Sequence, residues 1–137
     1  MKRILPLLLI AILFYACSAE KKIKRKLHSG SGKWEIIEYK RYFWSPVGMN
    51  NQNIFLCADC GTIEFKRNGS GVISISDPEG SGGYSFDYTN TEDVLTLSAD
   101  GGVVVYDITW NVNKTQMILS QNIGHVGYIN VITCKKK

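Results

Sequence analysis

The chain has 137 residues, of which 45% are hydrophobic, and its formal net charge is +4 at pH 7. The positive charge lies near the N-terminus, because residues 31–137 carry nine basic and eleven acidic side chains. A nucleic-acid-binding domain needs a basic face of its own, so the composition argues against nucleic acid as a partner.

The beginning of the chain predicts an export signal. Two basic residues precede the apolar run 4–16, which is too short to span a membrane, since a transmembrane helix needs about 20 apolar residues. Ala16 stands directly before Cys17, an ending that resembles the lipobox of bacterial lipoproteins. This resemblance implies that residues 1–16 are a signal peptide and that Cys17 carries acyl chains such as palmitate. The alternative is an ordinary secretory peptide with a cysteine nearby.

Residues 17–31 form a basic tether next to the expected lipid anchor. Its lysines would add about 1 kcal/mol each if they lay against anionic headgroups. We favour slightly the alternative that residues 18–32 are a solvated spacer. Residues 32–137 are then long enough for one domain with a single hydrophobic core.

Residues 32–137 show the pattern of an all-β domain. Hydrophobic side chains alternate with polar ones, as in Tyr84, Phe86 and Tyr88, and segments rich in Gly, Asn and Asp suit tight turns between the runs. We expect about eight strands, near residues 34–43, 62–67, 71–76, 83–88, 94–98, 103–110, 116–121 and 127–135. Short connections favour an antiparallel up-and-down order, and closure into a small barrel would protect the sheet edges.

Gly32-Lys33-Trp34 resembles the Gly-x-Trp signature of the lipocalin-like, or calycin-type, barrels. The order of segments, the length and the lysine-rich end resemble the small lipocalin-like lipoproteins of bacterial envelopes. The resemblance implies a barrel in which Trp34 closes one end under a basic residue of the last strand. Lys135 or Lys136 is expected to take that place and to stack as a cation on the ring.

Three further cysteines, Cys57, Cys60 and Cys134, permit three disulfide pairings. An exported protein meets an oxidising compartment, so one disulfide is the default expectation. In an up-and-down barrel the 44–61 connection would lie at the top and Cys134 at the bottom. A strand of eight residues spans about 26 Å, whereas bridged Cα atoms lie within about 7 Å. We therefore expect Cys57 to pair with Cys60.

The segment from Cys57 to Cys60 also allows a metal or redox interpretation. A thioredoxin-type pair would need a helix after its first cysteine, and a zinc site would need four ligands. Cu(I) needs only soft sulfur donors, which Cys57, Cys60 and Met49 could supply. Cys-Ala-Asp-Cys-Gly and the strand after it resemble the N-terminal barrel of an outer-membrane lipoprotein tied to copper homeostasis and envelope stress. Apart from this copper option, no cofactor is expected.

The candidate ligand contacts are Trp44 and Met49, in the long connection after the first strand, and the stripe Tyr84, Phe86 and Tyr88. No catalytic arrangement is suggested, so we do not expect an enzyme. Three functions stay open: a membrane-anchored barrel that binds a small apolar ligand, a copper or thiol sensor using Cys57 and Cys60, and a filled barrel that binds another envelope protein. The expected location is the cell envelope, on a membrane and most simply the outer membrane.

Overall fold

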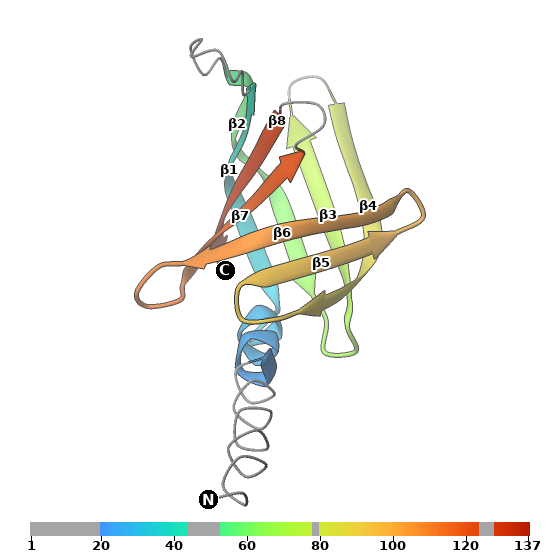
Figure 1. Ribbon diagram of the computed structural model, residues 1–137, viewed down its shortest axis with the longest axis vertical. Coiled ribbons are helices and arrows are strands. Elements are labelled where there is room, and N and C mark those ends of the chain that lie inside the picture. Colours follow the sequence, from blue (N-terminus) through green and yellow to red (C-terminus); the bar gives the residue numbers. More distant parts are fainter. Residues whose placement is uncertain (1–19, 44–52, 78–79, 124–127) are drawn as a thin grey trace, which may run out of the picture.

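The computed structural model describes residues 20–43, 53–77, 80–123 and 128–137 (Figure 1). Eight antiparallel strands follow one another around a closed barrel, and β8 pairs with β1 to complete it. The strands are β1 (Lys33–Phe43), β2 (Asn53–Phe65), β3 (Ser70–Asp77), β4 (Gly80–Asn90), β5 (Val94–Ala99), β6 (Gly102–Trp110), β7 (Gln116–Ile123) and β8 (Tyr128–Lys136). The predicted all-β up-and-down barrel is confirmed.

One side of each strand's alternating pattern fills the interior of the barrel. The buried side chains are hydrophobic except for Asn90 and Asn130. The hydrophobic core consists of Ile23, Leu27, Trp34, Ile36, Cys57, Cys60, Ile63, Phe65, Ile73, Phe86, Tyr88, Leu95, Leu97, Tyr106, Ile108, Met117, Leu119, Ile132 and Cys134. Every strand contributes to this core, so one continuous set of contacts holds the barrel together.

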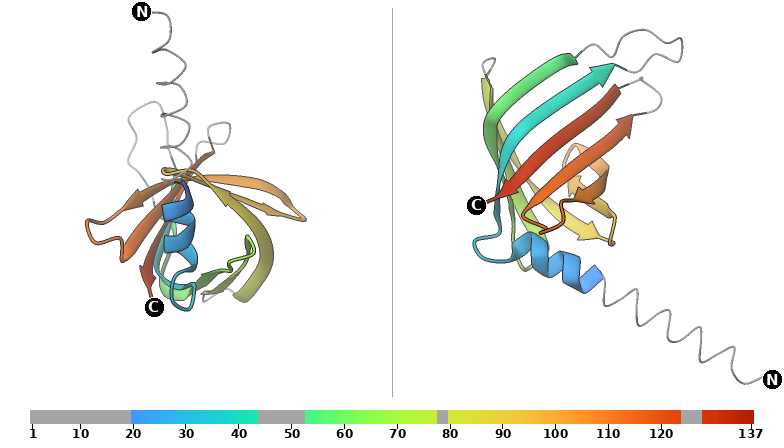
Figure 2. Two further views of the ribbon diagram at one scale, coloured as in Figure 1. Left: turned by 90° about the horizontal axis from the view of Figure 1, so that it is seen from below. Right: turned by 90° about the vertical axis from the view of Figure 1, so that its left-hand side faces the viewer.

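Residues 20–28 form a helix that packs against one end of the barrel (Figures 1 and 2). Ile23 and Leu27, one turn apart, are buried in the core, whereas Lys22 and Arg25 are exposed. The predicted solvated spacer is therefore wrong for this segment, because two apolar side chains fasten it to the barrel. We call this end of the barrel the helix end and the opposite end the distal end.

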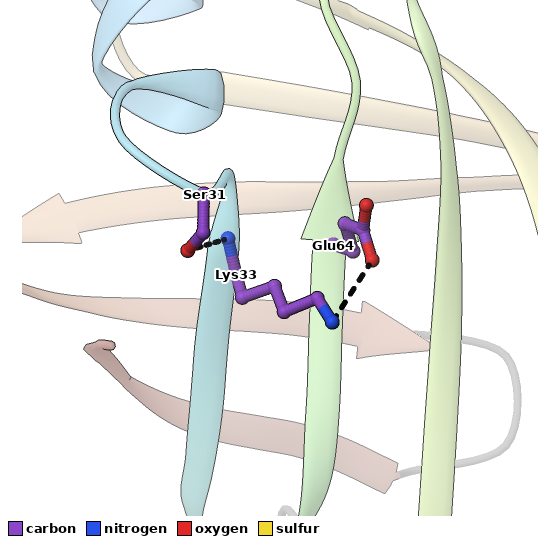
Figure 3. A network of polar contacts seen from close by, with 3 residues as sticks. All are labelled: Ser31, Lys33 and Glu64. Carbon is purple, nitrogen blue, oxygen red and sulfur yellow. Dashed lines mark hydrogen bonds and ion pairs between the residues drawn. The ribbon is translucent and has the colours of Figure 1, made fainter.

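A glycine fixes the path of the chain from the helix into β1. Gly32 has a φ of +70°, and a Cβ there would lie 2.3 Å from the carbonyl oxygen of Phe65. The Gly32 carbonyl in turn accepts a hydrogen bond from Phe65 N at 2.9 Å. On the surface beside it, Lys33 N donates to Ser31 Oγ at 3.2 Å, and Lys33 Nζ lies 3.8 Å from Glu64 Oε2 (Figure 3). Exposed ion pairs contribute little, so the close backbone approach explains why glycine precedes the tryptophan by two residues.

The second strand begins earlier than predicted. β2 starts at Asn53 rather than near residue 62, so Cys57 and Cys60 lie within a strand and not in a connection. The run 54–57 is entirely apolar and lacks the alternation of hydrophobic and polar residues that indicates a half-buried strand. Its pattern therefore predicts a connection.

A β-bulge interrupts the pairing of β1 with β2. Gly61 pairs with Ile36 but Ala58 pairs with Glu38, so two residues of β2 face one residue of β1. The bulge depends on positive φ values, 51° at Asp59 and 148° at Gly61. A Cβ at Gly61 would lie 2.0 Å from a carbonyl oxygen of β3, so only glycine fits this close approach.

The hairpin of β5 and β6 crosses the other strands at a steep angle (Figure 1). It pairs with its neighbours only near the helix end: β5 pairs with residues 87–90 of β4, and β6 pairs through residues 107–110 with β7. Residues 80–86 of β4 therefore have no ladder partner on the β5 side, and residues 102–106 of β6 have none on the β7 side. The wall of the barrel is thus less completely paired in its distal half than at the helix end.

Candidate ligand site

The helix end of the barrel is closed by Trp34, whose side chain is fully buried. Its Nε1 donates to the carbonyl of Leu27 at 2.8 Å, and its ring meets the edge of Trp110 at 5.8 Å between centroids. Lys136 Nζ lies 5.4 Å from the centre of the Trp34 ring. Lys136 is therefore the basic residue that stacks on Trp34. The prediction of Lys135 for this role is wrong, because Lys135 is the neighbouring residue of β8 and its side chain is exposed.

Lys136 also ties the helix to the last strand. Its Nζ donates to Ser29 Oγ and to the Lys26 carbonyl, the latter at 3.4 Å. Burial, and secondarily the charge of Lys26, lower the pKa of Lys136 from its ordinary value. The helix end is therefore a packed, hydrogen-bonded plug, and a ligand has no space there.

The distal half of the barrel differs because its interior contains a connected polar cluster. Arg41 Nε donates to Asn130 Oδ1 at 3.0 Å, and Arg41 Nη2 donates to the Tyr39 hydroxyl at 3.1 Å. The Tyr39 hydroxyl reaches Asn130 Oδ1 at 3.5 Å, and Asn130 Nδ2 donates to Gln121 Oε1 at 3.0 Å. These four side chains, from β1, β7 and β8, are called the arginine cluster below.

A second irregularity, between β1 and β8, explains how an arginine comes to face the interior: Ile36 pairs with Cys134 and Glu38 with Thr133, so Ile37 is an extra residue of β1. Before the bulge, the buried positions of β1 are Trp34 and Ile36. After the register shift, Tyr39 and Arg41 pair with buried residues of β8, and Tyr39 packs against the core. The sequence pattern of β1 conceals this change, since uninterrupted alternation from Trp34 would place position 41 outside.

Arg41 makes no ion pair with any of the described residues. The ion pairs found there join Lys33 to Glu64, Lys40 to Glu38 and Lys137 to Glu35. The partners of Arg41 are a phenol and an amide oxygen, both neutral. An arginine side chain is always charged, so among the described residues the positive charge of this partly buried cluster has no acidic partner.

The predicted stripe Tyr84, Phe86 and Tyr88 runs along the inner side of β4. Phe86 and Tyr88 are buried against Phe65, at 5.8 and 5.1 Å between ring centroids. Tyr88 reaches the helix end, where its hydroxyl donates to the Lys66 carbonyl at 2.8 Å. Tyr84 alone keeps an accessible ring, which is 45% exposed. The stripe therefore passes from packed core to accessible interior.

Burial raises the pKa values of two tyrosines in the barrel, Tyr84 and Tyr106. The pKa of Tyr106 is raised by burial and, to a smaller extent, by the charges of Tyr84 and Tyr39. The pKa of Tyr84 is raised by burial and by Tyr39.

A hollow of about 590 Å³ opens where the β5–β6 hairpin diverges from β4. It is lined by Tyr84, Ser85 and residues 99–104. Its size is that of a small-molecule site, typically about 300–1,000 Å³. The accessible ring of Tyr84 borders the hollow, so the aromatic stripe of β4 ends at this space.

Cys57 and Cys60 lie at disulfide distance, with 5.7 Å between their Cα atoms, as predicted. The sequence placed the two cysteines in a connection at the top of the barrel. That position was wrong, because both cysteines lie within β2. Cys134 on β8 pairs with Ile36, which also pairs with Gly61 next to Cys60, so all three cysteines occupy a similar level of the barrel. Cys134 is a free, fully buried thiol.

Metal binding finds no support in the described part of the chain. No group of three His, Cys, Asp or Glu side chains there is arranged to hold a metal ion. A Cys57–Cys60 disulfide offers no thiolate to Cu(I) while it is oxidised. Three predicted site residues, Cys17, Trp44 and Met49, lie outside the described residues.

Comparison of the sequence with protein-family models and with curated proteins found no match. Within residues 20–43, 53–77, 80–123 and 128–137, no helix has the length and apolar character needed to cross a membrane.

Proposed function

We propose that this protein is a membrane-anchored, lipocalin-like lipoprotein of the cell envelope that binds a small hydrophobic ligand in the distal half of its barrel. The lipid anchor on Cys17 and the outer-membrane location follow from the export signal in the sequence. The observation that carries the binding proposal is the accessible ring of Tyr84, which continues the buried line of Phe86 and Tyr88 into a hollow.

The contrast between the two halves of the barrel supports this proposal. At the helix end, Trp34 and Leu27 are fully buried, and Trp110 beside Trp34 is only partly accessible. In the distal half, the hollow is lined partly by Ala99 and Val104, which pack against the core yet stay partly accessible. Small side chains beside an exposed aromatic ring leave space for an apolar body, and eight-stranded barrels are wide enough for one small ligand.

Filling the hollow tests the proposal. Ala99→Phe would place a ring among Tyr84 and Val104, whereas Val105→Phe adds the same ring at a 51%-exposed position of the hairpin that does not line the hollow. We expect N-phenyl-1-naphthylamine, a neutral apolar fluorophore, to bind the unchanged protein and Val105→Phe alike. Ala99→Phe should weaken binding at least about tenfold. Equal affinity in all three proteins, or no saturable binding to any, would reject the proposal.

A second candidate function is a protein-interaction module. Residues 102–106 of β6 have no ladder partner on the β7 side among the described residues, and Val103 and Val105 on this strand are 66% and 51% exposed. Unpaired edges with apolar side chains are sites where another chain adds a strand. An empty barrel that copurifies with an envelope protein would favour this candidate.

A further inference from the structure

The basic residues of this protein gather at the helix end of the barrel. The helix and the segments around it carry twelve basic and three acidic side chains, whereas the rest of residues 20–137 carries two basic and nine acidic ones. The segments counted at the helix end are residues 20–33, 66–69, 91–93, 111–115 and 135–137. We propose that the helix end is a membrane-binding surface that lies against anionic phospholipid headgroups, so that the distal half of the barrel faces away from the bilayer. This inference rests on the proposed lipid anchor and adds the orientation of the protein on its membrane.

The helix presents its cations in a fixed direction. Ile23 and Leu27 point into the barrel core, and successive helical residues are rotated by about 100°. Lys21 and Arg25 each lie two residues before one of these anchors, so they project from the opposite side of the helix, and both are exposed. Backbone contacts at both sides also hold the helix, because Asn90 Nδ2 donates to the Glu20 carbonyl at 3.3 Å and Lys136 Nζ to the Lys26 carbonyl at 3.4 Å.

The helix and the turn between β2 and β3 form one continuous surface. Lys24 Nζ lies 5.8 Å from the centre of the Tyr88 ring, and a Cβ at Gly69 would lie 3.8 Å from the same nitrogen. Gly69 belongs to the turn that carries two exposed cations, Lys66 and Arg67. We call this surface the basic face, and it consists of Lys21, Lys22, Lys24, Arg25, Lys66 and Arg67.

The charges of the basic face are not compensated within the described residues. The ion pairs of that part of the chain involve Lys33, Lys40 and Lys137, none of which belongs to the basic face. Like charges also crowd the neighbouring side of the helix, where Lys26 contributes to the lowered pKa of Lys136. Gathering cations on one face is unfavourable for the isolated protein, and an anionic surface offsets that repulsion.

The distance from the expected anchor selects a membrane as the partner. Three residue steps separate Cys17 from Glu20, where the helix begins, and an extended chain covers at most about 11 Å in three steps. The attraction of basic side chains to anionic headgroups extends over roughly one Debye length, about 8 Å at physiological ionic strength. Acyl chains on Cys17 would therefore hold Lys21 and the first turn of the helix close to the headgroups. No comparable constraint brings another polyanion to this face.

Lysine acetylation in vesicles tests the contact residue by residue. The mature protein, exported and purified from a bacterial host, would be inserted into vesicles of phosphatidylcholine alone or of equal parts phosphatidylcholine and phosphatidylglycerol. A water-soluble acetylating reagent and peptide mass mapping give the modification rate of each lysine. Lys40, on β1 in the distal half, is the internal reference. The same rates would be measured for the double variant Lys21→Gln, Arg25→Gln and for the control Lys40→Gln.

We expect phosphatidylglycerol to slow acetylation of Lys21 and Lys66 at least about threefold, and about 0.5 M sodium chloride to restore it. Lys40 should react equally in both kinds of vesicle. The double variant should lose at least half of the protection of Lys66, whereas Lys40→Gln should keep it. Equal rates for Lys21 and Lys66 in both kinds of vesicle would overturn the surface, and so would protection of Lys21 alone or protection of Lys40.

The intact mass of the purified protein separates this inference from the proposed anchor. Acyl chains on Cys17 together with unprotected Lys66 would reject the basic face and keep the lipoprotein. If the purified protein carries no acyl chains, its sedimentation with the same vesicles becomes the test. Binding to phosphatidylglycerol vesicles that is weakened at least about tenfold in the double variant would support the basic face without the anchor. Absence of such binding would reject both.

Discussion

Single residues decide which side chains enter this barrel. Between β1 and β8, Ile37 is an extra residue of β1, because Ile36 pairs with Cys134 and Glu38 with Thr133. Beyond it the inward positions of β1 are Tyr39 and Arg41, and nothing in the sequence pattern of β1 announces this extra residue. The arginine cluster could therefore not be predicted from alternation, which assumes an unbroken period of two.

The Cys134 side chain has no exposed surface, and this burial raises the pKa of its thiol from 9.0 to about 12. The thiolate is the reactive form, so we expect iodoacetamide at pH 8 to leave Cys134 unmodified in the folded protein. The same reagent in concentrated urea should modify it fully, as measured by peptide mass mapping. Rapid modification under native conditions would contradict the buried position of β8.

The same pKa shift predicts how stability depends on pH. The folded state holds the Cys134 proton up to about pH 12, whereas the unfolded thiol loses it near 9.0. The protonated thiol therefore contributes its full share to the free energy of unfolding below pH 9. That share decreases as the pH rises, by up to about 1.4 kcal/mol for each pH unit above 9. Cys134→Ala removes it, so its free energy of unfolding should fall less steeply between pH 9 and 11, in urea titrations, than that of the unchanged protein. Parallel pH profiles would contradict this attribution.

At the scale of secondary structure, most strands were predictable and two segments were not. β3 to β8 follow the alternating pattern and the turn residues closely, because each has one buried and one solvated face. β2 was placed too late, since its first residues form an apolar run without alternation. The N-terminal helix was missed because its only apolar signal is Ile23 and Leu27 among five basic residues, and such a short pattern also fits a solvated segment.

The N-terminal helix should contribute to the free energy of unfolding through its two buried side chains, Ile23 and Leu27. Leu27→Ala removes a fully buried side chain and should reduce the free energy of unfolding by about 2–5 kcal/mol. Arg25→Ala, on the exposed face of the same helix, should change it by less than about 0.5 kcal/mol. Urea unfolding followed by tryptophan fluorescence would measure both, since Trp34 lies beside the helix. Equal effects of the two variants would mean that the helix does not pack as described.

At the scale of the whole molecule, the barrel is asymmetric along its axis. The helix, Trp34 and Lys136 seal one end with apolar contacts, hydrogen bonds and a cation over an aromatic ring. Within the described residues, the other half combines an arginine with only neutral partners, an accessible tyrosine and a partly unpaired wall. The sequence predicted the barrel and the closing tryptophan, but the division into a sealed and an accessible half depends on register and on the angle of one hairpin. Those features arise from contacts between distant strands.

Native mass spectrometry of the protein, exported by a bacterial host and purified without added ligand, tests the central claim most directly. We expect a noncovalent adduct of a few hundred daltons, released on denaturation as a small apolar molecule and absent from Ala99→Phe. A spectrum showing only the bare mass of the protein in both cases would contradict the ligand-binding barrel.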